Sequence, residues 1–104
     1  MPEDPMASIL ALTKQSLAIL STSTTRDDEL KALIRAAAHD MARQGITVDE
    51  TFTENDDLIN ATMVMFVKAN FGMIDEKQKE YAKETYILLC HNLGLSEGYK
   101  ESES

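Results

Sequence analysis

The side chains that could do chemistry in this chain are few, and two of them, Cys90 and His91, are neighbours. A thiol that lies beside an imidazole can become a nucleophile. If this segment is helical, however, successive side chains point about 100° apart, so the thiol and the imidazole do not face each other. We therefore expect Cys90 to be a buried structural cysteine.

Acidic residues are the second group that could do chemistry, because paired carboxylates can transfer protons or hold a metal. Asp27, Asp28 and Glu29 are consecutive, but they fall where a helix is expected to begin, and the helix dipole favours carboxylates there. His39 and His91 have no further histidine or cysteine at metal-ligand spacing. The sequence also contains no Walker loop, no dinucleotide-binding glycine fingerprint and no nucleophile elbow. We predict no catalytic, metal-binding or cofactor-binding residues, and expect that the protein is not an enzyme.

The composition indicates a single helical domain and limits the partners that it can bind. The chain has 104 residues, of which only two are proline and four are glycine. Its 18 acidic residues outnumber 10 basic ones, which argues against binding to nucleic-acid phosphates or to an anionic membrane. One cysteine allows no internal disulfide, and acidic residues near the N-terminus argue against a secretion signal. The longest apolar run, Met63 to Val67, is far below the roughly 20 residues that cross a membrane.

The hydrophobic pattern predicts an all-α fold, a small four-helix domain with one short and three longer helices. We expect a flexible arm at residues 1–11, the helical domain at 12–95 and a flexible acidic tail at 96–104. The short helix is predicted from Thr13 to about Leu20, with Leu12, Leu17 and Leu20 on its inner side. The second helix is expected to be capped by Thr25 or a neighbouring hydroxyl and to stop at Gly45. Its apolar stripe contains Leu30, Leu33, Ile34, Ala37 and Met41.

A connection of about ten residues follows, and it carries acids without a base. These acids are Asp49, Glu50, Glu54, Asp56 and Asp57. Long connections in small domains often have a function. The alternative is a solvated loop in which Thr53 and Asp56 have the spacing of a capping box for the next helix.

The third and fourth helices are expected at about Asn55–Ala69 and from Asp75 onward. The third is apolar around its whole circumference, so it is either the central helix or partly covered by another subunit. In the fourth, Gln78 has capping-box spacing from Asp75, and Gly94 fits the left-handed position after the helix, which would let Leu95 fold back onto Cys90. One face of the fourth helix is predicted to contain Tyr81, Thr85, Leu88, Leu89 and Asn92.

The order of these features resembles the head-to-tail connector proteins, also called adaptor or head-completion proteins, of long-tailed bacteriophages and their prophage relatives. The likeness covers about residues 12–100. The segment "DDEL" with the later Ile34, Ala37 and Ala38 matches the family's second helix, Phe71 and Gly72 match the end of its third, and Leu93–Tyr99 match its final segment. Gly94 departs from the serine that relatives often have there.

The resemblance implies a structural protein of the virion, located at the head–tail junction and assembled in the host cytoplasm. Such proteins form rings, usually dodecameric, beneath the portal; they extend the DNA exit channel and carry the next neck or head-closure protein. The implied partners are thus the portal, the neck protein and further copies of the chain, with DNA only as passing cargo, no cofactor and no membrane. A small helical regulatory or protein-binding module of phage origin, binding through the "MVMF" helix, remains an alternative.

The resemblance also suggests roles for three groups of residues. Docking to the portal or neck would use Leu95, Tyr99 and Lys100. Subunit packing would use Ala36, Ala37, Met63, Phe66 and Val67. The acidic connection with Asp49, Glu50, Glu54, Asp56 and Asp57 would face the channel.

Overall fold

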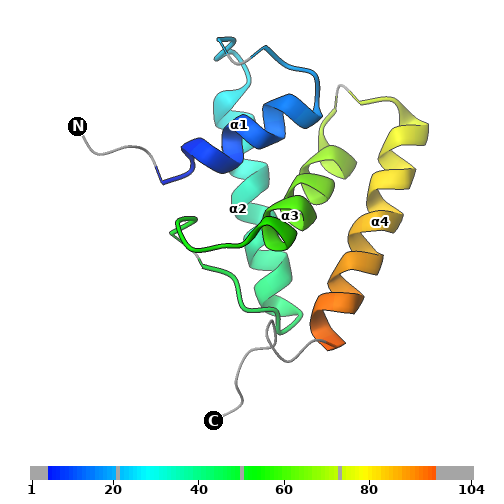
Figure 1. Ribbon diagram of the computed structural model, residues 1–104. Helices are drawn as coiled ribbons and strands as arrows, with labels where there is room; N and C mark the ends of the chain where they lie inside the picture. The colour runs from blue at the N-terminus through cyan, green and yellow to red at the C-terminus, as the bar shows by residue number, and fades with distance from the viewer. Residues whose placement is uncertain (1–4, 21, 50, 73, 96–104) are drawn as a thin grey trace.

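The computed structural model describes residues 5–20, 22–49, 51–72 and 74–95. Within these ranges the chain forms four helices and no strand, which confirms the predicted all-α class: α1 (Ala7–Ser16), α2 (Asp27–Arg43), α3 (Asp57–Asn70) and α4 (Glu76–Leu95). In Figure 1, α2 and α4 run in the same general direction, and α3 crosses between them. None of these helices is both long and apolar enough to cross a membrane.

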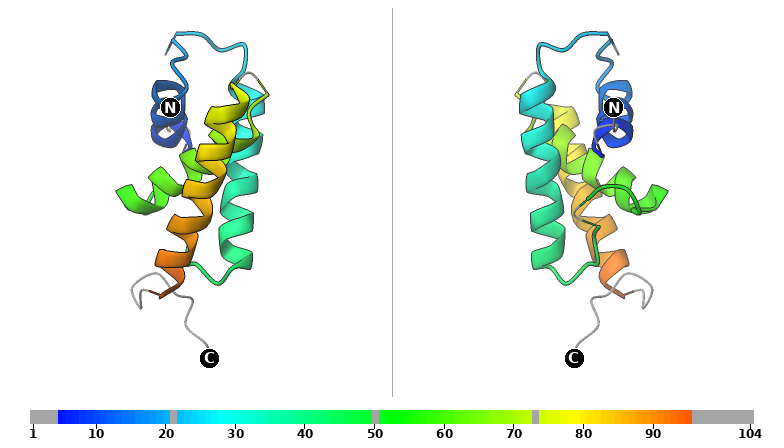
Figure 2. Two further views of the ribbon diagram at one scale, coloured as in Figure 1. Left: turned by 90° about the vertical axis from the view of Figure 1, so that its right-hand side faces the viewer. Right: turned by 90° about the vertical axis from the view of Figure 1, so that its left-hand side faces the viewer.

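The core is built around α3, which packs against each of the other three helices. Its Met63 and Val67 are completely buried, as are Leu30 and Ile34 from α2. The interpretation of α3 as the central helix is therefore confirmed for these side chains. Figure 2 shows that α1 and the first half of α3 lie on the same side of α2.

The second helix follows its predicted stripe closely. Leu30, Ile34, Ala37 and Met41 are fully buried, and Leu33 is half-buried against the core. The helix stops at Gly45 as expected, because Gly45 adopts a φ of 83° and turns the chain so that buried Ile46 donates a hydrogen bond to the Met41 carbonyl over 3.1 Å.

The start of α2 differs from the prediction, since no side-chain hydrogen bond caps it and Arg26, not Thr25, precedes it. A distant residue stabilises this end instead. Lys14 of α1 is only 5% exposed; its Nζ lies 2.6 Å from Asp27 Oδ1 and donates to the Ser23 carbonyl over 2.8 Å. The ion pair brings a positive charge to a carboxylate in the first turn of α2 and ties α1 to that turn.

The predicted bounds of the first helix were wrong. α1 begins at Ala7, inside the expected arm, because Met6, Ile9 and Leu10 are buried in the core. It ends at Ser16 because Ala18 adopts a left-handed φ of 58° and redirects the chain. Of the three leucines expected on its inner side, only Leu17 packs against the core; Leu12 and Leu20 are 40% and 75% exposed.

The caps of the last two helices also differ from the expected ones. Asp56 itself caps α3 by accepting a hydrogen bond from the Ile59 amide over 3.0 Å, so the capping box with Thr53 does not form. At the other end of the domain, α4 continues through Gly94 to Leu95. Gly94 therefore does not occupy a left-handed position after the helix, as the sequence had suggested.

The buried face of α4 lies to one side of the predicted face. Ala82, Tyr86, Cys90 and Leu93 point into the protein, whereas Tyr81 and Leu88 are 69% and 58% exposed. The reason is that α4 carries apolar residues at helical spacing on two sides, and only one side meets α3.

Candidate interaction surfaces

The connection before α3 is folded around one carboxylate, that of Asp49. Its two oxygens accept hydrogen bonds from the amides of Thr51, Thr53 and Glu54 over 3.0, 3.1 and 2.7 Å. They also accept from the Thr51 and Thr53 hydroxyls, and Asp49 and Asn55 exchange two further hydrogen bonds through the Asp49 main chain. These hydrogen bonds, led by that of the Thr51 hydroxyl, hold the pKa of Asp49 well below its ordinary value.

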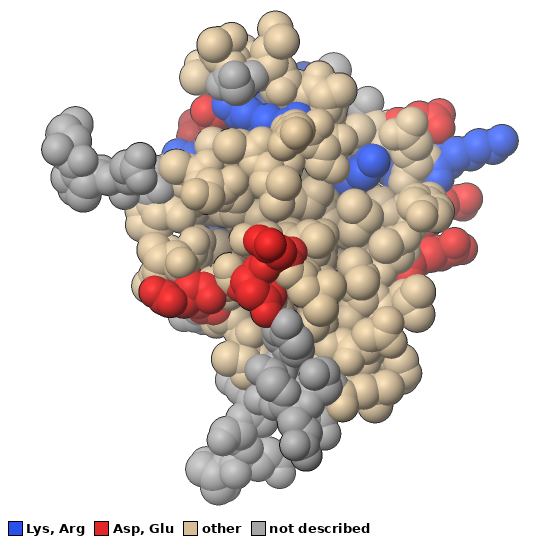
Figure 3. Space-filling view, in the orientation of Figure 1, with Lys and Arg blue, Asp and Glu red and all other residues tan. Residues whose placement is uncertain are grey.

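This arrangement gives the acidic connection a defined shape. Phe52 at its tip has a left-handed φ of 62° and packs partly against the core. Glu54, Asp56 and Asp57 are exposed, and Figure 3 shows acidic side chains gathered over the connection and the start of α3. Glu50 lies outside the described residues. In its described part the connection thus presents negative charge to solvent from a fixed loop.

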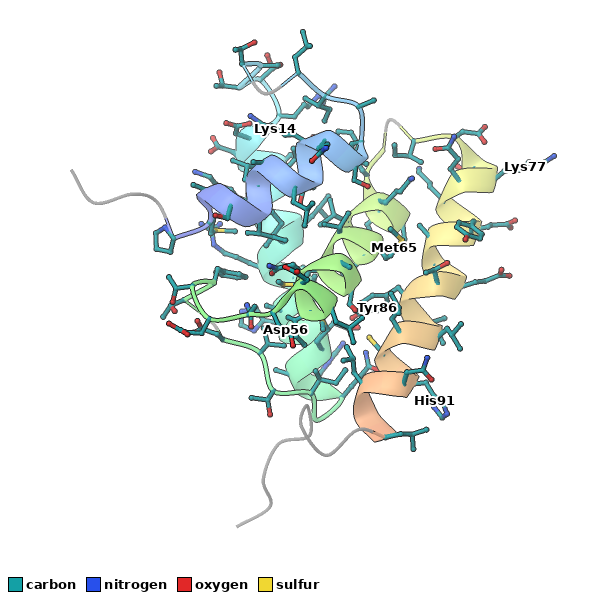
Figure 4. All side chains as sticks on the ribbon, in the orientation of Figure 1. Lys14, Asp56, Met65, Lys77, Tyr86 and His91 are labelled. Carbon is teal, nitrogen blue, oxygen red and sulfur yellow. The ribbon has the colours of Figure 1, made fainter. Side chains whose placement is uncertain are left out.

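A partly buried polar junction between helices was not foreseen from the sequence. Tyr86 of α4 donates its hydroxyl to Asp40 of α2 over 2.5 Å, and Asp40 also accepts from Arg43 and Gln44. The Tyr86 ring meets Phe66 of α3 edge to face, with centroids 5.2 Å apart. Figure 4 shows Tyr86 directed from α4 toward the other helices. One side chain therefore links α2, α3 and α4.

The pKa shifts of the residues at this junction favour a structural role for them over a catalytic one. Burial alone would raise the pKa of Asp40, but the hydrogen bonds from Tyr86, Arg43 and Gln44 outweigh it and lower that pKa. Burial, with the hydrogen bond to Asp40, raises the pKa of Tyr86 well above its ordinary value. Burial likewise raises the pKa of the Cys90 thiol, which makes it a poorer nucleophile. Cys90 is buried, as predicted.

The residues suggested for subunit packing do not form one surface. Ala37, Met63 and Val67 are completely buried within the chain, so they belong to its own core and cannot contact another subunit in this conformation. Phe66 is half-buried against Tyr86, and Ala36 is exposed on α2. Among the suggested docking residues, Leu95 ends α4 and is 69% exposed, whereas Tyr99 and Lys100 lie outside the described residues.

Two apolar surfaces are among those left uncovered in the described part of the chain. The first, the α4 ridge, consists of Tyr81, Leu88 and Leu95, spaced seven residues apart and exposed by 69%, 58% and 69%. The second, the α1–α3 hollow, has a volume of about 200 Å³. It is lined by Leu12, Ser16, Ala61, Val64 and Met65. In the described part of the chain, no three His, Cys, Asp or Glu residues are placed to hold a metal ion.

Comparison of the sequence with known protein families gave a match. A family described as phage connector protein matches residues 9–100, which include all four helices except the first two residues of α1. The searches of curated proteins and of solved structures gave no match. The family match extends over nearly the whole domain and agrees with the resemblance inferred from the helix motifs. The chain therefore belongs to the phage connector protein family and has a structural role as a phage connector.

Proposed function

We propose that this chain is a subunit of a ring at the head–tail junction, where it docks on the portal, extends the DNA exit channel and carries the next neck protein. The observation that supports this proposal most strongly is the family match over residues 9–100. The fold is consistent with a building block, because its polar junction and buried thiol stabilise the domain and offer no exposed reactive group. We propose no catalytic activity and no cofactor.

The acidic connection is the part of the surface best suited to line a DNA channel. Glu54, Asp56 and Asp57 are exposed without a basic residue in this segment, and Asp49 fixes the shape of the loop. A negatively charged wall repels phosphates, whereas lysine and arginine would bind them and slow the passage of DNA. This surface favours DNA as passing cargo and argues against its being a ligand.

Docking on the portal is assigned to the end of α4 and the residues that follow it. Leu95 supplies an exposed apolar side chain at the end of a rigid helix. Tyr99 and Lys100 were suggested by the family resemblance, and aromatic residues are common anchors at interfaces. The family match reaches residue 100 and so includes both of them.

Deletion of the gene from the phage or prophage that encodes the chain tests the function. We expect particles with portal-containing heads that lack attached tails, and recovery of infectious particles when the chain is supplied from a plasmid. Antibody labelling of complete virions should place the chain at the head–tail junction. Normal virions in the deletion strain would contradict the proposal and would favour a regulatory module.

A further inference from the structure

A groove between α3 and α4, here called the α3–α4 groove, has a volume of about 370 Å³. Its lining includes the aromatic pair of Phe66 and Tyr86 and the side chain of Ile87, which is 58% exposed. Lys83 and Asn70, both exposed, add polar groups to the lining. In Figure 4, Tyr86 lies where α4 meets α3. The groove therefore suits an apolar side chain that is accompanied by a negative charge.

The residues that follow α4 are long enough to reach this groove. Ile87 lies eight residues before Leu95, about 12 Å back along the helix axis. Tyr99 lies outside the described residues, and the four residues from Leu95 to Tyr99 span at most about 14 Å. The tyrosine side chain adds to this reach. Gly94 is seven residues after Ile87 and thus on the same side of α4; even a Cβ there would meet no atom within 4 Å.

The charge that follows Tyr99 has the spacing of the charge beside the groove. In an extended chain, residues two apart point to the same side and lie about 6.6 Å apart. The turn of α4 from Ile87 back to Lys83 covers about 6 Å. If Tyr99 lies on Ile87 and the chain continues toward the start of α4, the next residue on this side is Glu101. Glu101 then faces Lys83, so the apolar contact and the ion pair form in the same register.

We propose that, in the free chain, the segment after α4 folds back so that Tyr99 occupies the α3–α4 groove and Glu101 pairs with Lys83. The fold-back is a contact within one chain. It rests on the proposed function in one respect, namely that Tyr99 is also the residue to which portal docking is assigned. A portal then binds only the fraction of chains that have released Tyr99, and its apparent affinity is lowered by that fraction. The groove thus holds back the docking residue until a portal competes for it.

The fold-back is expected to be weak and still populated. One ring and one exposed ion pair contribute little to stability compared with the core of the domain. The short connection to Tyr99, however, gives the contact an effective concentration in the millimolar range. The favourable register ends at Glu101, because Glu103 would next face Glu80 of α4. We therefore expect the fold-back to leave the Tm nearly unchanged, and a local probe is needed to detect it.

A tryptophan introduced at position 99 tests the contact. The chain contains no tryptophan, so the fluorescence of Tyr99→Trp reports on this position alone. We expect acrylamide to quench it at least about twofold less than in a peptide of residues 94–104 with the same change. Ile87→Ser should raise the quenching to the level of the peptide. Leu88→Ser is the matched control, because Leu88 is also 58% exposed but lies on the α4 ridge.

Two outcomes of this measurement would overturn the fold-back. One is quenching of Tyr99→Trp in the full chain that equals quenching in the peptide. The other is an equal effect of Ile87→Ser and Leu88→Ser. Protection that is lost on about hundredfold dilution would assign the groove to a residue of a second copy and would overturn the contact within one chain.

A charge exchange tests the register. In the Tyr99→Trp chain, Glu101→Lys should raise the quenching at least about 1.5-fold, and the further change Lys83→Glu should restore the protection. Lys77→Glu is the control, because Lys77 is exposed on α4 but does not line the groove, and it should restore nothing. No effect of Glu101→Lys, or equal restoration by both lysine changes, would overturn the register.

Binding to the portal ring tests the competition. Ile87→Ser should bind the ring at least about twofold more tightly than the wild type, whereas Leu88→Ser should bind it equally well. Equal affinities of wild type and Ile87→Ser would overturn the competition. Chains that bind the portal although the introduced tryptophan is as accessible as in the peptide refute only the fold-back. Chains that protect this tryptophan but ignore the portal refute only the connector role.

Discussion

The hydroxyl of Tyr86 donates a hydrogen bond to Asp40 over 2.5 Å, joining the middle of α4 to the last turns of α2. α3 lies between these helices and contacts the same tyrosine through Phe66. Contact with α3 decides which side of α4 is buried, and the Tyr86–Asp40 hydrogen bond adds a link from that side to α2. The α4 ridge lies on another side of the helix from this partly buried polar contact.

Tyr86→Phe tests this contact. The variant removes a hydrogen bond to a charged group, which is worth about 1.5–3 kcal/mol, and the partial exposure of Asp40 favours the lower end of that range. We expect the free energy of unfolding in urea at pH 7 to fall by about 1–2 kcal/mol. Tyr81→Phe is the matched control, because Tyr81 lies on the same helix but is 69% exposed, and it should change the value by less than about 0.5 kcal/mol. Equal effects of the two changes would contradict the assigned role.

The same contact predicts a pH dependence with a defined sign. The pKa of Asp40 is lowered from 3.8 by folding, so its contribution is present above pH 3.8 and is lost as the pH falls through the lower folded value. The pKa of Tyr86 is raised from 10.0, so its contribution is present below pH 10.0 and is lost at higher pH. The stability difference between the wild type and Tyr86→Phe should therefore be largest between these two values. A difference that grows below pH 3.8 would contradict this account.

Asp49→Ala tests whether one carboxylate holds the acidic connection. Without it, the amides of Thr51, Thr53 and Glu54 lose their acceptor, and we expect their hydrogen exchange to accelerate at least about tenfold. Glu54→Gln is the control, since it removes an exposed charge but leaves these acceptors in place. Unchanged exchange rates in Asp49→Ala would show that the loop is held by other contacts.

Gly94→Ala distinguishes the observed end of α4 from the one expected from the sequence. Gly94 is helical, and a Cβ added there would meet no atom within 4 Å, so alanine should stabilise the protein by about 0.5–1 kcal/mol. The reverse applies to Gly45, whose φ of 83° should make Gly45→Ala destabilising by about 1–2 kcal/mol. Thermal unfolding of the two variants measures both effects. Destabilisation by Gly94→Ala would support a helix that stops before this residue.

Truncation after Leu95 separates folding from docking. All four helices and the buried side chains are kept, so we expect the Tm to change by less than about 2 °C. Binding to the portal should be lost together with Tyr99 and Lys100. A large fall in Tm would instead assign the removed residues to the stability of this domain.

The helices that were predicted well are those with a single apolar side. In α2 the apolar residues form one stripe and the charged residues lie off it, so the buried face of the helix could be predicted. Its C-terminus could be predicted because Gly45 readily adopts the positive φ that ends a helix. In α4, two sets of apolar residues have helical spacing, and from the sequence either could form the buried face. One set contains Tyr81 and Leu88, and the other contains Tyr86 and Cys90. Only contact with α3 decides which set is buried, and that information is not local in the sequence.

The features missed by sequence reasoning depend on contacts between distant residues. Lys14 would be expected in solvent, yet it is buried because Asp27 and the Ser23 carbonyl lie within reach in the folded chain. The early start of α1 could have been suspected, because Pro5 stands just before it and proline is common at the beginning of helices. For the interaction surfaces, the acids of the connection were recognised from their types. The role of Asp49 in shaping the loop required the backbone geometry.

The central claim is that this connector assembles in several copies on a portal. The most direct measurement is the mass of the complex formed when the purified chain is mixed with the portal ring encoded by the same phage or prophage. We predict a discrete complex in which many copies of the 11.6 kDa chain are added to each portal ring, and none of these copies when the chain is truncated after Leu95. A portal ring whose mass stays unchanged at a large excess of the full-length chain would contradict the account.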